Sequence, residues 1–246
     1  MSQMNSIIFN NSKLVLWLRY IGTDFWMVAL FPFYIGFVIS SKTFYSTNLL
    51  HGILSICFLT SSTFVLNHVL DLEFDKQNPR KSFSLLVRNE ISIKNSFLLF
   101  TLLSLFCLFF SLTVNYGFIL CILGLILISL LYNIPPFRLK NRPILDVLCH
   151  TLSLGILCPI AGWCLSDSSG LINAFSNFPF LYLLSISFYV TALHSPTMAV
   201  DFDADIKSGT TTFATKFGAE RTMLFSWLLT TVGAFVLFVS GALVIE

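Results

Sequence analysis

Seven apolar segments dominate the sequence, each close to the roughly 20 helical residues that cross the hydrocarbon core of a bilayer. They lie at residues 25–41, 49–70, 96–114, 117–133, 144–166, 178–200 and 222–245. Charged residues make up only 11% of the 246 positions, whereas soluble domains have about 25%. The sequence therefore predicts an all-α fold, in which one polytopic transmembrane bundle of about seven spanning helices takes up residues 1–246.

Two segments carry further local information. Only residues 115–117 separate the third segment from the fourth, which predicts a tight helical hairpin. The fifth segment contains Pro159 and Gly162, which predict a kink or a close approach of two helices. The six cysteines lie in or beside apolar runs without a CxxC pair, so we interpret them as packing residues and expect neither disulfides nor a zinc site.

The basic residues predict an orientation. Thirteen of the 14 Lys and Arg residues lie in the N-terminal tail and in the loops after the second, fourth and sixth segments, and Lys42 alone falls on the other side. By the positive-inside rule these loops face the cytoplasm, in the plasma or inner membrane if the source is bacterial. The net charge of +2 and the lack of a basic stretch interleaved with aromatic residues argue against nucleic acid as a partner.

A first acidic motif follows the second segment. Asn67, Asp71 and Asp75 are spaced four residues apart, so on a helix they stack along one face. Carboxylate and amide oxygens are hard donors that suit Mg²⁺, an ion that keeps several waters and bridges to substrate phosphates. Asn67 lies inside the apolar run, where a polar group is costly without a partner. The motif therefore predicts a metal site that binds a diphosphate.

A second acidic motif follows the sixth segment. Asp201 and Asp205 stack at the same spacing, whereas Asp203 points away from them on an ideal helix. Asp203 is therefore either a residue behind the metal ligands or a sign of local unwinding. Arg80 and Lys207 follow the two motifs at similar distances, as expected where cations clamp a diphosphate. The recurrence of the pattern argues against ordinary solvated loop acids. The alternative is a transporter, in which intramembrane polar groups line an ion path; it predicts charges at mid-span or broken helices in matching halves, whereas here the acids cluster at helix ends and no repeat is visible.

Together these residues resemble the UbiA family of membrane prenyltransferases. The family signature is NDxxDxxxD after the second helix and DxxxD after the sixth. Supporting similarity lies in NPRK at residues 78–81, in residues 132–140 and in residues 205–218. The resemblance implies that Mg²⁺ ions held by both motifs bind a prenyl diphosphate donor. The donor ionises to an allylic cation, which alkylates a hydrophobic acceptor such as a quinone-ring precursor or a carotenoid. Membrane lipid is a further expected partner, because it surrounds the protein.

The resemblance assigns roles to particular residues. The metal-binding and catalytic set is Asn67, Asp71, Asp75, Asp201 and Asp205. The expected substrate-binding set is Arg80, Lys207, Arg138, Lys140, His68, His194 and Asp203. The acceptor, the prenyl chain length and the oligomeric state are left open.

Two departures from the family pattern leave a catalytically weakened homologue as an alternative. His68 stands where the family usually has its first Asp, and family members usually have nine helices. A neutral imidazole at this position can ligate a metal or donate to a phosphate, but one carboxylate is lost. His194 is expected either to face the acceptor or to bond a neighbouring helix. Asp146 is expected to be an N-cap-type residue that the helix dipole favours or an acceptor-site group, or to pair with Arg138 or Lys140.

Overall fold

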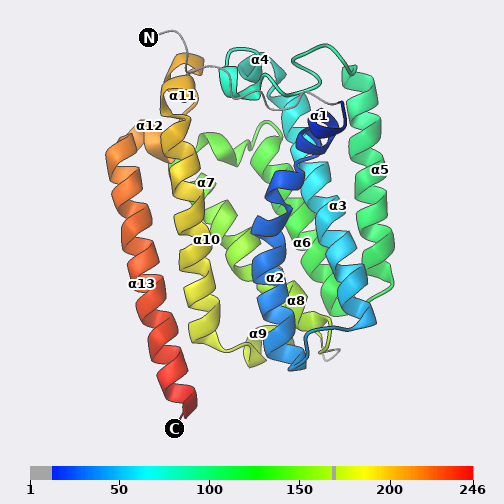
Figure 1. Ribbon diagram of the computed structural model, residues 1–246, viewed down its shortest axis with the longest axis vertical. Coiled ribbons are helices and arrows are strands. Elements are labelled where there is room, and N and C mark those ends of the chain that lie inside the picture. Colours follow the sequence, from blue (N-terminus) through cyan, green and yellow to red (C-terminus); the bar gives the residue numbers. More distant parts are fainter. Residues whose placement is uncertain (1–12, 168–169, 246) are drawn as a thin grey trace.

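Seven helical segments are long and apolar enough to span a membrane in the computed structural model, which describes residues 13–167 and 170–245. They are Thr23–Ser41, Thr47–Leu70, Ile93–Leu112, Tyr116–Asn133, Pro143–Cys164, Phe180–Val200 and Ala219–Gly241. Each coincides with one predicted segment, so the predicted all-α bundle of seven spanning helices is confirmed. Figure 1 shows the segments running side by side between the two ends of the molecule.

The long elements divide as follows: η1 Thr23–Phe25, α2 Trp26–Ser41, α3 Thr47–Leu70, α5 Ile93–Leu112, α6 Tyr116–Asn133, α7 Pro143–His150, η4 Thr151–Leu157, α8 Cys158–Cys164, α10 Phe180–Val200 and α13 Ala219–Ile245. The short ones are α1 Lys13–Tyr20, α4 Leu72–Asp75, η2 Pro79–Lys81, η3 Leu139–Asn141, α9 Leu171–Asn177, α11 Phe202–Ser208 and α12 Phe213–Phe217. Figure 1 places α4, α11 and α12 at the same end of the bundle, and α9 at the other.

Polar caps define where several helices begin. The side chains of Ser46, Ser92 and Asn115 accept hydrogen bonds from backbone N–H groups in the first turns of α3, α5 and α6. Such caps satisfy N–H groups that have no partner within the helix. Since α5 ends at Leu112 and α6 begins at Tyr116, the predicted tight hairpin is confirmed.

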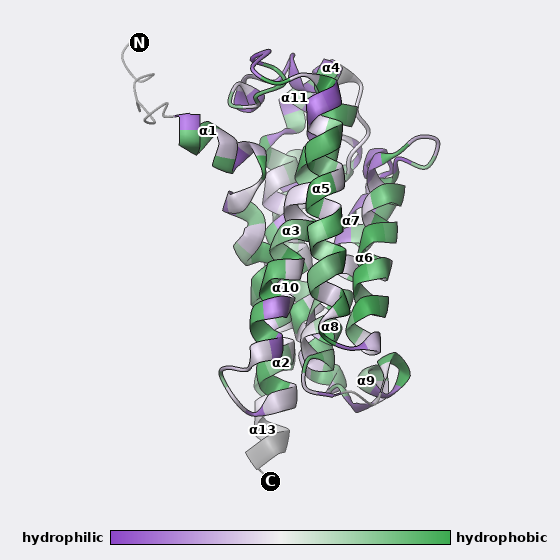
Figure 2. Ribbon diagram, turned by 90° about the vertical axis from the view of Figure 1, so that its right-hand side faces the viewer, coloured by the Kyte–Doolittle hydropathy of each residue, from purple (hydrophilic) through white to green (hydrophobic). Residues whose placement is uncertain are grey.

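The outer faces of the bundle are apolar. Large side chains such as Phe106 and Phe109 on α5, and Trp227 and Phe238 on α13, are at least half exposed. Figure 2 shows hydrophobic residues along the helices and hydrophilic residues gathered mainly at the end that carries α4 and α11. Lipid is the solvent that accommodates such a surface, because water would penalise it.

Glycines bring α2 and α8 into backbone contact. A Cβ atom on Gly36 would lie 1.9 Å from the carbonyl oxygen of Pro159, and one on Gly162 would lie 1.8 Å from that of Phe33. Only a residue without a side chain permits this approach. The close approach predicted around Pro159 and Gly162 is therefore confirmed. The wide π-helical turn η4 directly precedes it in the same spanning segment.

Candidate functional site

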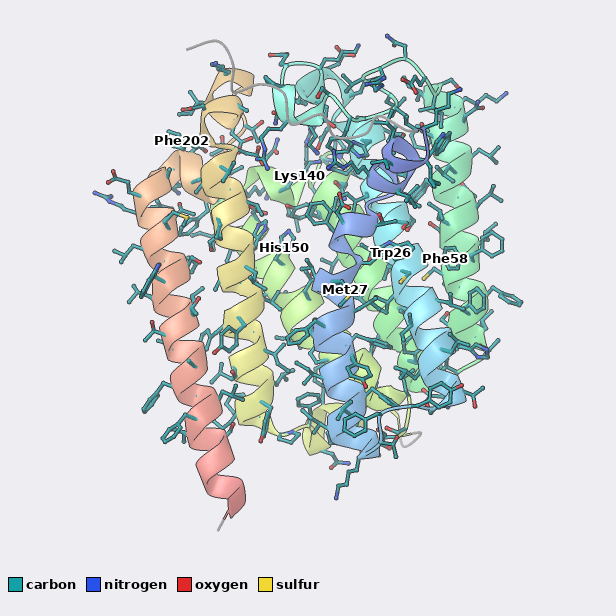
Figure 3. The ribbon with its side chains drawn as sticks, in the orientation of Figure 1. Trp26, Met27, Phe58, Lys140, His150 and Phe202 are labelled. Carbon is teal, nitrogen blue, oxygen red and sulfur yellow. The ribbon has the colours of Figure 1, made fainter. Side chains whose placement is uncertain are left out.

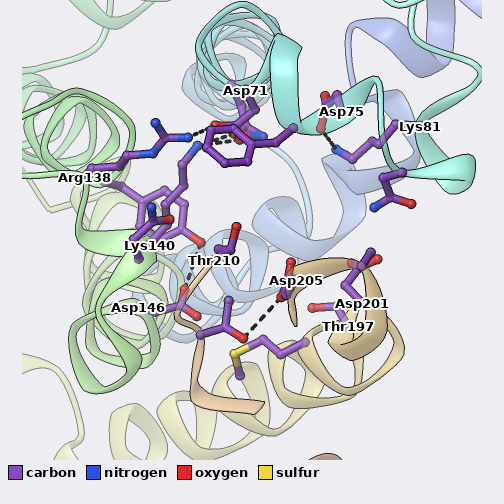
Figure 4. A pocket seen from close by; sticks show the side chains of 18 of the residues that line it. Asp71, Asp75, Lys81, Arg138, Lys140, Asp146, Thr197, Asp201, Asp205 and Thr210 are labelled. Atoms are coloured by element: carbon purple, nitrogen blue, oxygen red, sulfur yellow. Dashed lines mark hydrogen bonds and ion pairs between the residues drawn. The ribbon is translucent and has the colours of Figure 1, made fainter. Parts of the chain in front are cut away.

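Both acidic motifs line one cavity of about 220 Å³ at the end of the bundle where α3 and α10 finish. The motif residues on its wall are Asn67, Asp71, Asp75, Asp201 and Asp205. Figure 4 shows Asp71 on one side of the cavity and Asp201 and Asp205 across from it. The convergence of the two motifs, on which the predicted metal site depends, is therefore a feature of the structure.

Each motif lies at a break between a long helix and a short one. Asp71 separates α3 from α4, and Asp201 separates α10 from α11. The predicted continuous helix is thus interrupted, but its hydrogen-bond pattern persists. The N–H group of Asp75 donates to the carbonyl of Asp71 at 2.8 Å, and that of Asp205 donates to the carbonyl of Asp201 at 2.9 Å. The four-residue spacing therefore still places the carboxylates of each motif on one side.

Two cations from the connection between α6 and α7 hold Asp71. The carboxylate accepts hydrogen bonds from Nη2 of Arg138 and Nζ of Lys140, both at 2.6 Å. Lys140 also donates to the side-chain oxygen atoms of Asn67 at 2.8 Å and Asn133 at 3.1 Å. Burial lowers the pKa of the Lys140 ammonium, and the Asp71 carboxylate opposes this change. Both cations line the cavity.

Arg138 adopts a strained conformation to reach this position. Its φ of 37° lies in the left-handed region, which residues other than glycine rarely occupy. Its guanidinium lies 4.9 Å from the centre of the Phe74 ring, and its buried Nε atom has no hydrogen-bond partner among the described residues. A strained, partly unpaired cation on a cavity wall is typical of a side chain that binds an anionic ligand.

Asp75 is held from behind by His68. The imidazole Nδ1 lies 3.2 Å from the carboxylate, and Lys81 Nζ lies 3.9 Å from its other oxygen. His68 is 1% exposed and stacks on the Tyr20 ring at a centroid distance of 4.9 Å. His68 thus packs between Asp75 and Tyr20 and is not among the residues that line the cavity. The imidazole therefore contacts a metal-type carboxylate instead of the space where a phosphate would lie.

The second motif has its own polar partners. Arg80 donates to Asp201, so this arginine of η2 joins the first motif region to the second. The Thr212 hydroxyl donates to Asp205 at 3.2 Å. Burial raises the pKa of the Asp205 carboxyl to about 6, and the neighbouring carboxylates Asp201 and Asp146 add to the effect. Negative charge is therefore concentrated on this wall.

Two other predicted site residues face outward. Asp203 and Lys207 are exposed and are not among the residues that line the cavity. Asp203 is two residues from each ligand-type carboxylate of its motif, and this spacing turns it away from them on a helix, as predicted. The substrate-binding roles of both residues stay predictions.

A buried polar cluster forms the deep end of the cavity. Asp146, at 2% exposure, accepts hydrogen bonds from the Tyr132 hydroxyl at 2.9 Å and from Nε2 of His194 at 3.3 Å. Neither Asp146 nor Tyr132 belongs to the metal-binding or substrate-binding sets that the sequence predicts. The available signal was an ionisable residue inside an apolar segment, which marks a functional position by default. His194 bonds a neighbouring helix, as one of its expected alternatives states, and it also lines the cavity. Its role toward the acceptor stays a prediction.

The donor set fits a divalent cation of the Mg²⁺ type. Asn67, Asp71, Asp75, Asp201 and Asp205 offer only carboxylate and amide oxygens, the ligands that hard cations prefer. Burial, together with the neighbouring carboxylates, raises the pKa of Asp205, and a divalent cation beside this carboxyl group would favour its ionised form. These five residues are the ones that would hold the ion.

Comparison with known proteins identifies the chain's relatives. The family model of the UbiA prenyltransferases matches residues 29–245. The chain belongs to the UbiA prenyltransferase family. With seven helices of spanning length, this UbiA member is an integral, multi-pass membrane protein.

Solved UbiA structures share the fold. A UbiA homolog from Archaeoglobus fulgidus bound to DMAPP and Mg²⁺ superposes with a TM-score of 0.74 at 24% identity, covering 89% of this chain and 75% of that one. The same homolog bound to GPP and Mg²⁺ gives 0.73 at 24% identity, over 90% and 76%. The apo structure of a homolog from Aeropyrum pernix K1 gives 0.71 at 20% identity, over 85% and 77%. At these identities the likeness establishes the UbiA fold.

A curated relative is closer in sequence. The chain is 32% identical over 176 residues to the chloroplastic 2-acylphloroglucinol 4-prenyltransferase of Humulus lupulus. The alignment covers 70% of this chain and 41% of that protein, so the chain spans less than half of the relative's length.

Proposed function

We propose that the protein transfers a prenyl group, with Mg²⁺, from a prenyl diphosphate to a hydrophobic acceptor inside the membrane. One observation carries the proposal: carboxylates from two distant helix ends line a single cavity together with Arg138 and Lys140. A diphosphate needs both kinds of group. Oxygen donors hold its metal ions, and cations contact its own oxygens.

The donor's diphosphate would lie at the mouth of the cavity. Arg138 and Lys140 bind its oxygens there, exchanging part of their contact with Asp71 for contact with the ligand. Arg80, bound to Asp201, offers a further cation at the rim. When bound, Mg²⁺ neutralises the charge that develops on the departing diphosphate.

The cavity wall also carries apolar and aromatic side chains. Phe74, Met198, Ala204 and Tyr132 line it beside the acidic motifs. Apolar and aromatic groups exclude water, which would otherwise capture an allylic cation. The Tyr132 ring also offers a π face that attracts a cation. These residues thus keep water away from the allylic cation that forms when the donor ionises.

The relatives support an isoprenoid donor. The solved UbiA homolog from Archaeoglobus fulgidus carries DMAPP or GPP with Mg²⁺, and the curated relative is named for prenylation of a 2-acylphloroglucinol. For this chain we propose a donor of the same class, and an acceptor among hydrophobic ring compounds or other lipids. We further propose that residues 1–246 act as one domain, with the cavity open to the cytoplasmic side.

The proposal is tested with the purified chain in lipid nanodiscs. Radiolabelled geranyl diphosphate is supplied with Mg²⁺ or with EDTA, and diphosphate release and labelled lipophilic products are both measured. The acceptor panel includes an acylphloroglucinol, a dihydroxynaphthoate and a carotenoid. We expect Mg²⁺-dependent release that Asp71→Asn and Asp201→Asn each lower by about 100-fold or more, the scale on which one electrostatic contact to a developing charge acts.

The matched control is Glu220→Gln, which alters an exposed carboxylate outside the cavity. It should leave release unchanged. Release that is equal with Mg²⁺ and EDTA, or equal in the motif variants and the wild type, would contradict the proposal. Mg²⁺-dependent release far below that of an active UbiA enzyme would identify the weakened homologue.

A further inference from the structure

The deep end of the cavity holds an arrangement that metal and diphosphate binding do not use. Asp146 and His150 lie on α7, His194 lies on α10, and Tyr132 lies at the end of α6. Figure 3 shows His150 nearer the middle of the bundle than Lys140. Ionisable groups within spanning segments are costly, so their presence calls for a chemical task.

The hydrogen bonds fix the roles of the His194 nitrogens. Nε2 lies 3.3 Å from the Asp146 carboxylate, which can only accept, so Nε2 carries the proton. The Thr197 hydroxyl lies 3.5 Å from Nδ1, but its proton is donated to the backbone carbonyl of His194 at 2.7 Å. Nδ1 is therefore left with a lone pair. A buried carboxylate behind one nitrogen and a lone pair on the other is the arrangement of a general base.

The same residues could instead suggest a metal site, because one ligand atom from each of Asp146, His150 and His194 lies within 4.8 Å of the others. The ring geometry argues against it. The two imidazoles stack with centroids 3.6 Å apart and planes 25° from parallel. Nitrogen lone pairs lie in the ring plane, so nearly parallel rings cannot both direct theirs at one ion. Stacking instead holds the His194 ring in place.

We propose that His194 is the general base for the acceptor and that Asp146 is its positioning residue. This inference rests on the proposed prenyl transfer. His194 lies seven residues before Asp201 on α10, about 10 Å along a helix with a rise of about 1.5 Å per residue. That length leaves room for the reacting carbon of the donor and an acceptor ring between the acidic motifs and the base. Both ends line the same cavity.

The proton and electron balance is complete within this site. The C1–O bond of the donor breaks, and its electron pair leaves with the diphosphate. A nucleophilic carbon or oxygen of the acceptor forms the new bond to C1, and the proton displaced from the acceptor passes to Nδ1 of His194. The resulting imidazolium is stabilised by Asp146, to which Tyr132 also donates.

This chemistry selects a class of acceptor. The substrate must reach the base with a proton to lose, and the Asp146 carboxylate beside it disfavours a second negative charge. The structure thus points to an uncharged hydroxylated ring, a phenol or an enol, rather than a carboxylate-bearing ring.

The test separates donor cleavage from acceptor alkylation. In nanodiscs with Mg²⁺, labelled geranyl diphosphate and an acylphloroglucinol, we compare the wild type, His194→Gln and Asp146→Asn. Both variants should keep diphosphate release, with geraniol as the product, while prenylated phenol falls by about 100-fold or more, the contribution typical of a general base. His51→Gln, a substitution at the other end of the bundle, should change neither the diphosphate release nor the yield of prenylated phenol.

Several results would overturn the inference. Among these are equal loss of release and product in His194→Gln, an unchanged ratio of product to geraniol, or prenylation of a hydroxylated carboxylate in preference to the uncharged phenol. If the wild type releases no diphosphate, the proposed prenyl transfer fails by itself.

A second measurement does not depend on activity. In ¹⁵N-histidine-labelled protein, which has four histidines, the signal lost in His194→Gln should be that of a neutral ring protonated at Nε2. Asp146→Asn should change that tautomer, an effect that a purely structural Asp146 would not have. A stoichiometric Zn²⁺ ion that perturbs this signal and is lost in His194→Gln would make the cluster a metal site and contradict the inference.

Discussion

At the scale of single residues, the contacts behind the acidic motifs determine what each carboxylate can do. Asp71 and Asp201 each contact an arginine, whereas Asp75 contacts His68 and lies 3.9 Å from Lys81. Contacts with a cationic side chain can be exchanged when an anionic ligand arrives. An imidazole that is 1% exposed cannot move in this way. His68 therefore fixes the orientation of Asp75 rather than competing for the ligand.

His68→Phe tests this role. Phenylalanine keeps the ring that stacks on Tyr20 and removes a buried Nε2 atom that has no partner among the described residues, but it leaves the buried Asp75 without its imidazole partner, so the melting temperature should fall. The lost hydrogen bond to Asp75 involves a charge and contributes about 1.5–3 kcal/mol. The Mg²⁺ concentration for half-maximal diphosphate release should therefore rise about tenfold or more.

The readout for His68→Phe is a Mg²⁺ titration of donor cleavage, with thermal unfolding measured on the same sample. His51→Phe serves as the control, because that histidine bonds Thr113 far from the motifs. A Mg²⁺ requirement equal to that of the wild type would show that Asp75 does not depend on His68.

Lys140→Met tests the cation that joins the first motif to the donor. The side chain keeps its length but loses the donor to Asp71 and to any phosphate oxygen. Arg138 still neutralises Asp71, so the protein should fold. The KM for geranyl diphosphate should rise by about 10- to 100-fold, the equivalent of one charged hydrogen bond.

For Lys140→Met, initial rates over a range of donor concentrations give KM and kcat separately. Lys216→Met, a change to an exposed cation beside the Phe217 ring, is the control and should behave as the wild type. A fall in kcat at unchanged KM would mean that Lys140 acts on the leaving group rather than on donor binding.

At the scale of helices, close packing around the cavity depends on small residues. α2 and α8 touch backbone to backbone through Gly36 and Gly162. Both helices belong to spanning segments, and α8 continues through η4 into α7, which carries Asp146. The position of the deep cluster therefore depends on this contact.

Gly36→Ala should destabilise the protein. The added Cβ would lie 1.9 Å from the Pro159 carbonyl oxygen, a backbone atom that cannot turn aside. Overpacking of this kind costs about 1–3 kcal/mol or more, so the thermal midpoint in detergent should fall by several degrees. Gly241→Ala, where no atom lies within 4 Å of the new Cβ, is the matched control. Equal midpoints for the two variants would contradict the close contact.

The sequence predicts the helices better than it predicts the polar contacts. Apolar length locates all seven spanning segments, because the bilayer imposes that length on every one. Four-residue spacing predicts which face the acids share. Whether Asn67 lies beside Lys140, or Asp146 beside His194, depends on how distant segments pack. No local pattern encodes how these segments pack.

At the scale of the whole molecule, charge is distributed unevenly along the bundle. Thirteen of the 14 basic residues lie in the N-terminal tail or in connections at the cavity end, and Lys42 follows α2 at the other. A substrate with an ionic diphosphate and an apolar tail fits this asymmetry. In the proposed reaction, the head of the donor would reach the polar end from water, while its tail would extend among apolar helices whose outer faces are suited to lipid.

The asymmetry predicts that the cavity end faces the cytoplasm. The six native cysteines are buried and should react little with a membrane-impermeant maleimide, so single added cysteines report the orientation. Tyr45→Cys lies in the exposed turn between α2 and α3, and Lys76→Cys follows α4 at the cavity end. In a bacterial host, Tyr45→Cys should label in cells with a permeable outer envelope. Lys76→Cys should label only after the inner membrane is opened; the reverse pattern would place the active end outside and cut it off from cytosolic prenyl diphosphates.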